Sequence, residues 1–169
     1  INVVAHDGSV SLAGGSNSTT RYAQVGHGGS NTGGGMSGNI NLIAGGGDLS
    51  LTGGGGTNTY AMVGHGEAAA TSTGTRQGGI HLFASGAFSA TDGGGANSGA
   101  FVIHQTGGGL ASGDYLGGDG FQLVGNGGVT LSDGSLTGVQ TMVDGNIGSG
   151  PISLAFANDI DITIGAGND

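Results

Sequence analysis

The sequence contains no cysteine and no lysine, and it holds one proline, Pro151, and only two basic side chains, Arg21 and Arg76. Without cysteine the chain forms no disulfide and no thiolate metal site. A chain without thiols suits a protein that crosses an oxidising periplasm unfolded. No run of 18 apolar residues occurs, so the sequence predicts no transmembrane helix and no membrane insertion.

Basic side chains are also scarce. Two arginines stand against eleven carboxylates, and the formal net charge is −9. Binding to nucleic acid needs basic groups that displace counterions from phosphates, and attachment to anionic lipid needs the same sign of charge. The composition therefore argues against nucleic acid and anionic membranes as partners. The chain also shows no signal peptide and begins at Ile1 rather than methionine, so we expect the true N-terminus elsewhere.

Glycine is abundant, with 44 residues, and it interrupts every candidate helix. The sequence instead repeats itself with a period of about forty residues. INVVAHDGSVSLAGG near the start matches INLIAGGGDLSLTGG one period later. The last interval is shorter than the others, and the repeats begin near Ile1, Ile40, Ile80, Phe121 and Ile152.

Each repeat contains short segments in which apolar and polar residues alternate, the signature of a half-buried strand. The first segments align in a column at Ile1, Ile40, Ile80, Phe121 and Ile152. The second segments align at Val10, Leu49, Phe88, Val129 and Ile160. Polar residues between the apolar ones should face water, at Ser11, Ser50, Ser89, Thr130 and Asp161. Third segments in the first four repeats align at Val25, Val63, Val102 and Val143, and a polar stretch after them is interpreted as an outward loop.

These columns predict an all-β fold, a right-handed parallel β-helix (β-solenoid) of about five repeats of about forty residues, in one unit over 1–169. We expect one three-sided coil per repeat, and the alternatives are two coils of about twenty residues each or a closed barrel or sandwich. Joined head to tail, the chain ends read GNDINVV, close to the internal SGNINLI. We therefore expect either a fragment or one unit of a longer array, with units arranged end to end.

The third segment carries a specific motif. YAQVGHGG at Tyr22–Gly29 and YAMVGHGE at Tyr60–Glu67 resemble the Tyr-Ala-x-Val-Gly-His-Gly repeats of giant bacterial exoproteins similar to filamentous haemagglutinin, passengers of two-partner or autotransporter secretion. The flanking GNINLIAGGGDLSLTGG is similar to another pattern of the same family. The resemblance covers most of the chain and fades after Gly107. It implies export, a β-helical fold and a role in adhesion or matrix formation, and it implies no catalytic residue.

Three histidines, His27, His65 and His104, fall at one position of successive repeats. Rings repeated about every 4.8 Å could bind a transition metal or respond to mild acid. The simpler interpretation is a corner histidine that hydrogen-bonds the next turn.

Asp159, Asp161 and Asp169 are candidate Ca²⁺ ligands, because IGAGND is similar to half of a calcium-binding nonapeptide. Calcium-binding solenoids repeat that unit, and a single copy is more simply an ordinary turn, so no cofactor is expected. Arg21 and Arg76 belong to different repeats, and no Gly-x-Ser-x-Gly elbow with a paired histidine occurs, so no catalytic residue is expected either.

The sequence thus predicts a structural rod of an extracellular bacterial adhesin or filament, secreted or on the cell surface, and not an enzyme. Its expected partners are copies of itself or adjacent solenoid units, with a cell-surface glycan or matrix as a further candidate. A glycan- or ice-binding solenoid is the alternative, although serine rather than threonine in the outward column argues against ice. A polysaccharide-cleaving β-helix enzyme is the third hypothesis.

Overall fold

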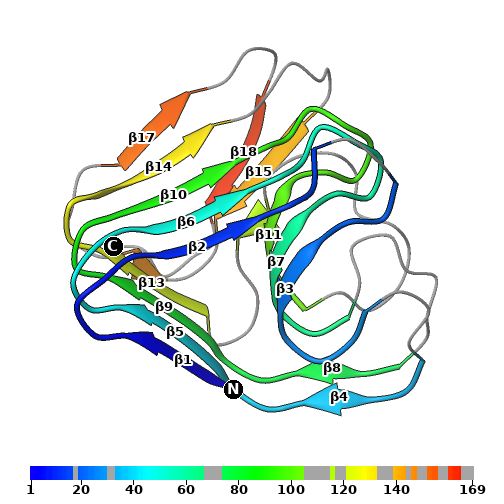
Figure 1. Ribbon diagram of the computed structural model, residues 1–169, viewed down its shortest axis with the longest axis horizontal. Coiled ribbons are helices and arrows are strands. Elements are labelled where there is room, and N and C mark those ends of the chain that lie inside the picture. The colour runs from blue at the N-terminus through cyan, green and yellow to red at the C-terminus, as the bar shows by residue number, and fades with distance from the viewer. Residues whose placement is uncertain are drawn as a thin grey trace.

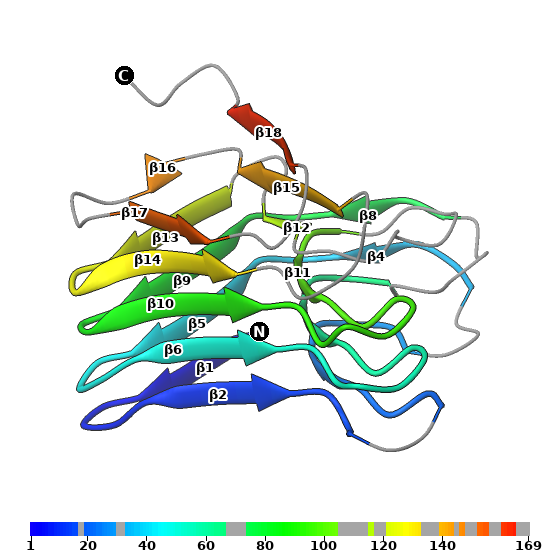
Figure 2. The same ribbon diagram turned by 90° about the horizontal axis from the view of Figure 1, so that it is seen from above.

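All regular structure in the described part of the chain is β-strand (Figure 1). A computed structural model describes residues 1–16, 19–29, 33–66, 74–104, 115–116, 121–132, 139–143, 146–147, 152–155 and 160–164. Every pairing between strands is parallel, and Figure 2 shows successive strands lying one above another in layers. The chain therefore forms a parallel, solenoid-like stack, in agreement with the alternating pattern of its repeats.

Three sheets form the walls of the stack. The first sheet contains β1 (Asn2–Ala5), β5 (Ile40–Ala44), β9 (Ile80–Ala84), β13 (Phe121–Gly125) and β16 (Asn146–Ile147). The second contains β2 (Val10–Ala13), β6 (Leu49–Thr52), β10 (Ala87–Thr91), β14 (Gly128–Ser132) and β17 (Ile152–Ala155). The third contains β3 (Ala23–Val25), β7 (Ala61–Val63), β11 (Ala100–Val102), β12 (Tyr115–Leu116), β15 (Val139–Val143) and β18 (Ile160–Ile164).

The register of the strands confirms the predicted columns of the first four repeats in two of the sheets, and of the first three repeats in the third sheet. Neighbouring strands in the first sheet pair at Asn2, Asn41, His81 and Gln122. The second sheet aligns Val10, Leu49, Phe88 and Val129. The third sheet aligns Val25, Val63 and Val102. Because each strand lies beside its equivalent in the next repeat, the first two repeats contribute one strand to each of the three walls.

The predicted columns are wrong for the last part of the chain. Ile152 lies beside Val129 in the second sheet, not beside Phe121 in the first. Ile160 lies beside Val139 in the third sheet instead of the second. The strand that follows β13 in the first sheet is β16, which places Ile147 beside Leu123. Alternation of apolar and polar residues is the same in all three walls, so it does not tell which wall a strand joins.

Three further strands, each of two residues, depart from the predicted three per repeat. β4 (Met36–Ser37) and β8 (Arg76–Gln77) pair with each other in the stretch interpreted as an outward loop. β12 enters the third sheet between β11 and β15, so that Leu116 separates Val102 from Val143. Strands of two residues carry too few side chains to show a period in the sequence.

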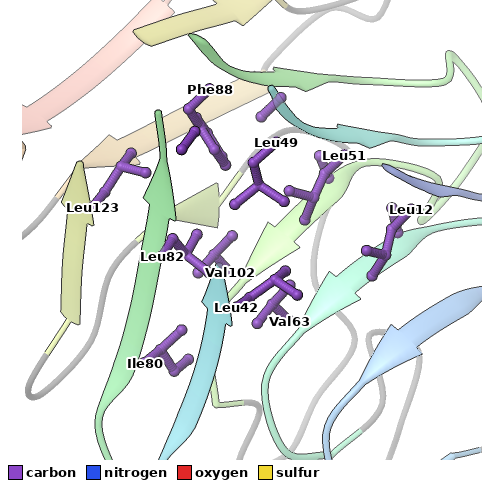
Figure 3. Close-up of a cluster of buried hydrophobic side chains, with 14 of the residues drawn as sticks. Leu12, Leu42, Leu49, Leu51, Val63, Ile80, Leu82, Phe88, Val102 and Leu123 are labelled. Atoms are coloured by element: carbon purple, nitrogen blue, oxygen red, sulfur yellow. The ribbon is translucent and has the colours of Figure 1, made fainter. Parts of the chain in front are cut away.

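A hydrophobic core runs up the inside of the three walls (Figure 3). Leu42 and Leu82 enter it from the first sheet, and Leu49 and Leu51 enter it from the second. Val63 completes the core from the third sheet, and four of these five side chains have no exposed surface. Since each layer is thin, the core gains its depth only by stacking layer on layer.

Glycine allows the layers to approach closely at the corners. A Cβ atom on Gly53 would overlap the carbonyl oxygen of Ser98 in the next layer and lie 2.6 Å from its carbon. A Cβ atom on Gly64 would lie 2.7 Å from the carbonyl carbon of Ile103, and Gly64 also has a φ of 152°. At Gly53, therefore, glycine is required to leave space for the neighbouring chain.

Candidate functional site: a histidine ladder

The histidines His27, His65 and His104 lie directly after the third wall of successive layers. Each follows the valine that ends β3, β7 or β11 by two residues. Because those valines are in register, the histidines share a column, as the sequence predicted. The imidazole rings of His27 and His65 stack with centroids 5.0 Å apart, and those of His65 and His104 with centroids 4.7 Å apart. We call this column the histidine ladder.

Main-chain hydrogen bonds tie each rung of the ladder to the next. The backbone N–H of His27 donates to Nδ1 of His65 over 3.0 Å. The backbone N–H of His65 donates in the same way to Nδ1 of His104, also over 3.0 Å. These bonds run between layers, so the interpretation as a corner histidine that hydrogen-bonds the next turn is confirmed.

The second ring nitrogen closes each coil. Nε2 of His65 lies 2.9 Å from the carbonyl oxygen of Gly38, and Nε2 of His104 lies 2.8 Å from that of Gly78. Since Nδ1 of each ring accepts a hydrogen bond, Nε2 must carry the proton and donate it to the carbonyl. Gly38 precedes the first wall of the coil and His65 follows its third wall, so this bond fastens the end of the three-walled section to its start.

The environment favours neutral imidazole. Burial lowers the pKa of His65, the carbonyl of Gly38 opposes that effect, and the positive charges of His104, His27 and the amino group of Ile1 lower it further. Burial also lowers the pKa of His104, against the raising effect of the Gly78 carbonyl. The His65 side chain has no exposed surface. A ring deprived of water binds a proton less readily than a ring in solution.

This geometry does not offer the ladder to a metal ion. A metal needs a ring nitrogen with a free lone pair, whereas in His65 and His104 Nδ1 accepts one hydrogen bond and Nε2 donates another. The rings also stack face to face instead of converging on a point. Within the described ranges, no group of three histidine, cysteine, aspartate or glutamate side chains could hold a metal.

The candidate Ca²⁺ ligands lie near the end of the chain. Asp161 lies in β18, where Asp161 pairs with Gln140 of β15. Asp159 and Asp169 lie outside the described residues, as does the rest of the IGAGND segment after Ile164. The calcium hypothesis therefore stays a prediction.

The ladder explains the motif that contains it. In Tyr-Ala-Met-Val-Gly-His, Ala61 and Val63 face the main core, whereas Tyr60 and Met62 lie in a second hydrophobic cluster with Phe101. The ring of Tyr60 stacks on that of Tyr22, with centroids 4.8 Å apart and planes 4° apart. Every position of the motif therefore contacts either a core or the adjacent layer. The motif consequently encodes the stacking of coils.

Sequence reasoning missed three polar side chains of this region. Gln24 donates from Nε2 to the carbonyl oxygens of Gly64 and Gly66, over 3.1 and 2.8 Å, and so reinforces the ladder between the first two layers. Asn97 donates from Nδ2 to Oδ1 of Asn58 over 2.8 Å. Amide side chains are common in any loop, so the composition of the loops gives no sign that Asn58 and Asn97 pair.

The two arginines have different surroundings. Arg76 is 6% exposed, and its Nη1 donates to the carbonyl oxygens of Gly34, in the preceding repeat, and Thr75. Arg21 is exposed. Arg76 thus links successive layers at β4 and β8, and its position gives it a structural role.

One buried carboxylate also escaped the sequence analysis. Asp92 is 6% exposed, and its Oδ1 accepts hydrogen bonds from the N–H of Gly94 and the hydroxyl of Ser98 over 3.3 and 3.4 Å. Asp92 lies at the corner after β10, and among the described residues its Oδ2 has no hydrogen-bond partner. Its two hydrogen bonds, to the main chain of Gly94 and the side chain of Ser98, connect residues of the same corner.

Comparison with known proteins finds no matching family model, no similar curated protein and no similar solved structure. The resemblance to filamentous-haemagglutinin-like exoproteins therefore stays a prediction from the motif. Within the described part of the chain, no helix has the length and apolarity that crossing a membrane requires.

Proposed function

We propose that this chain is a structural rod segment of an extracellular bacterial adhesin or filament that serves surface attachment or the assembly of a matrix or fibre. The rod is a right-handed parallel β-helix of about five coils. Support for the winding comes from the strong preference of parallel crossover connections for the right hand. The motif-level resemblance to secreted exoproteins supports the extracellular location.

The observation that carries this proposal is the continuity of side-chain columns along the stack. Leucines, histidines, tyrosines and asparagines each lie on their equivalents in the next layer. A repeated layer of this kind contacts only its neighbours, so the stack can be extended without changing any contact inside it. That property suits a protein whose role requires a long, regular rod. The ladder, in which the ring nitrogens of His65 and His104 are already hydrogen-bonded, holds neighbouring coils together.

Microscopy of the purified chain tests the proposal. We expect single particles to lengthen with concentration by end-to-end stacking, with a constant width. The matched variants are Leu51→Asp, which disrupts the stack from inside, and Ser50→Asp, whose side chain lies on the outward column of the same strand. Elongated particles from the unmodified chain and from Ser50→Asp, but not from Leu51→Asp, support a rod. Compact particles of fixed size at every concentration contradict it.

A second function, glycan binding, is favoured by the outer face of the first sheet. Asn41 donates from Nδ2 to Oδ1 of Asn2 over 2.6 Å, and Val4, beside this pair, is 49% exposed. Ile43 and Phe83 follow Val4 in the same half-exposed column. Amide groups beside an apolar strip suit the hydroxyl and C–H faces of a neutral sugar. Binding to an array of neutral glycans that Asn41→Asp abolishes would establish it, and an array without signal would remove it.

A further inference from the structure

The histidine ladder is compatible with only one protonation state of its rings. Nδ1 of His65 and of His104 must present a lone pair, because a backbone N–H from the preceding layer points at it. A proton on Nδ1 would place two N–H donors against each other over 3.0 Å. It would also place a cation 4.7 Å from a second imidazole. The neutral ladder is therefore cohesive, and the charged ladder is not.

We propose that the histidine ladder is a proton-sensitive latch between coils, closed at neutral pH and released in mild acid. Release means that the layer-to-layer bonds from the His27 and His65 amides are lost while the walls of the stack stay paired. This inference goes beyond the rod function, because it assigns to one corner of the rod a response to the medium.

Burial and the charged groups that face the ladder oppose a positive charge on it, and two backbone carbonyls only partly offset them. His65 experiences His27, His104 and the amino group of Ile1, all of which are cationic when protonated. The carbonyls of Gly38 and Gly78 accept from Nε2 in both states and raise the pKa of the two rings, but by less than burial lowers it. Among the described residues, no carboxylate contributes to the pKa of either ring.

The direction of the pH dependence follows from these lowered pKa values. A buried histidine whose pKa lies below the ordinary value of 6.5 binds fewer protons in the folded chain than in the unfolded chain. Its contribution to stability is fully present above pH 6.5 and is lost as the pH falls from there toward the folded pKa. Carboxylates titrate lower, with ordinary pKa values of about 4. The loss of stability from histidine protonation therefore begins at a higher pH than the loss from carboxylate protonation.

Nearby bonds that do not titrate keep the response local. Gly64 and Gly66 donate from the main chain to the carbonyl oxygens of Val25 and His27, both over 2.9 Å. The Gln24 amide adds two more bonds to the same corner. Because these bonds persist in acid, release of the latch loosens the corner and leaves the core intact.

Amide hydrogen exchange resolved by residue tests the latch. After correction for intrinsic rates, we expect the protection of the His27 and His65 amides to fall between pH 7 and pH 5, by up to about tenfold for each pKa unit by which folding lowers the pKa of the rings. The Leu51 amide in the second wall should keep its protection. The double variant His65→Asn/His104→Asn should lose this pH dependence. The control His81→Asn, which removes a histidine of the first wall outside the ladder, should keep it.

Protection of the His27 and His65 amides that stays constant to pH 5 would overturn the latch, and so would a pH dependence that survives the double variant. If the double variant does not fold, ¹⁵N chemical shifts of the unmodified rings decide. Titration of His65 and His104 below pH 6.5 from the Nε2–H tautomer supports the latch, and titration at or above 6.5 refutes it. Neither outcome depends on whether the chain assembles into rods, so the proposal can fail while the rod function stands.

Discussion

The substitution Gly53→Ala tests the stacking of the layers at a single atom. The new Cβ would overlap the carbonyl oxygen of Ser98 and lie 2.6 Å from the Ser98 carbonyl carbon and 2.7 Å from the nitrogen of Gly93. All three atoms belong to the main chain of the next layer, so no side chain can rotate to make room. The layers must separate locally, and the bond from the Gly53 N–H to the Thr91 carbonyl, now 2.8 Å, must lengthen or break.

The magnitude follows from two contributions. Overpacking a tight interior costs about 1–3 kcal/mol, and leaving a buried backbone group without its partner costs about 1–3 kcal/mol. We therefore expect Gly53→Ala to lower the free energy of unfolding by about 2–6 kcal/mol. For a domain of this size that loss corresponds to a fall in Tm of roughly 10 °C.

The matched control is Gly8→Ala, at the corner between β1 and β2. A Cβ there would meet no atom within 4 Å, so the free energy of unfolding should change by no more than about 0.5 kcal/mol. Thermal and urea unfolding followed by circular dichroism measures both variants. Equal stability of Gly53→Ala and Gly8→Ala would refute the close approach of the layers that this account describes.

Three further predictions concern the core, a turn and metal ions. Leu51→Asp should lower the free energy of unfolding by several kcal/mol, since it buries an unpaired carboxylate, whereas Ser50→Asp on the outward column should have little effect; a Leu51→Asp variant with an unchanged Tm would place the core elsewhere. Thr20→Asn should raise the free energy of unfolding by about 1 kcal/mol. Thr20 has a φ of 60°, and asparagine tolerates this conformation better than a β-branched residue does, as at Asn58 and Asn97. A fall in the Tm of the variant would contradict this prediction. Chelator, or added Zn²⁺, should leave the Tm unchanged at neutral pH, because both ring nitrogens of His65 and of His104 are hydrogen-bonded. A rise in Tm with Zn²⁺ would show a metal site after all.

The repeating part of the fold could be predicted from the sequence because each layer repeats the same physical requirement. Leu42 and Leu82 occupy equivalent positions and pack on each other, so their shared period directly reports contact between strands. The same argument placed His27, His65 and His104 in one column. The argument from the period failed at Ile152 and Ile160, because fewer residues separate neighbouring strands there than in the first repeats. The alternating pattern alone fits any of the three walls.

The chemistry of the ladder was less accessible to sequence reasoning. A column of histidines is compatible with metal binding, with a response to pH or with structural hydrogen bonds. Only the positions of Gly38 and of the neighbouring backbone amides distinguish these three roles. Those partners lie 27 and 38 residues away from His65 in the chain. The stacked amides of Asn58 and Asn97 are a similar case, since their pairing depends on a turn conformation with φ near 55° that the loop sequence does not specify.

The most direct test of the in-register stack is the scalar coupling between nitrogen atoms across its layer-to-layer hydrogen bonds. In ¹⁵N-labelled protein at neutral pH, we predict a correlation from the His27 amide to Nδ1 of His65 and another from the His65 amide to Nδ1 of His104. Both correlations together would place three successive coils in the register described above. Ring shifts that show a proton on Nδ1, with no correlation to either amide, would contradict both the ladder and the stacking that depends on it.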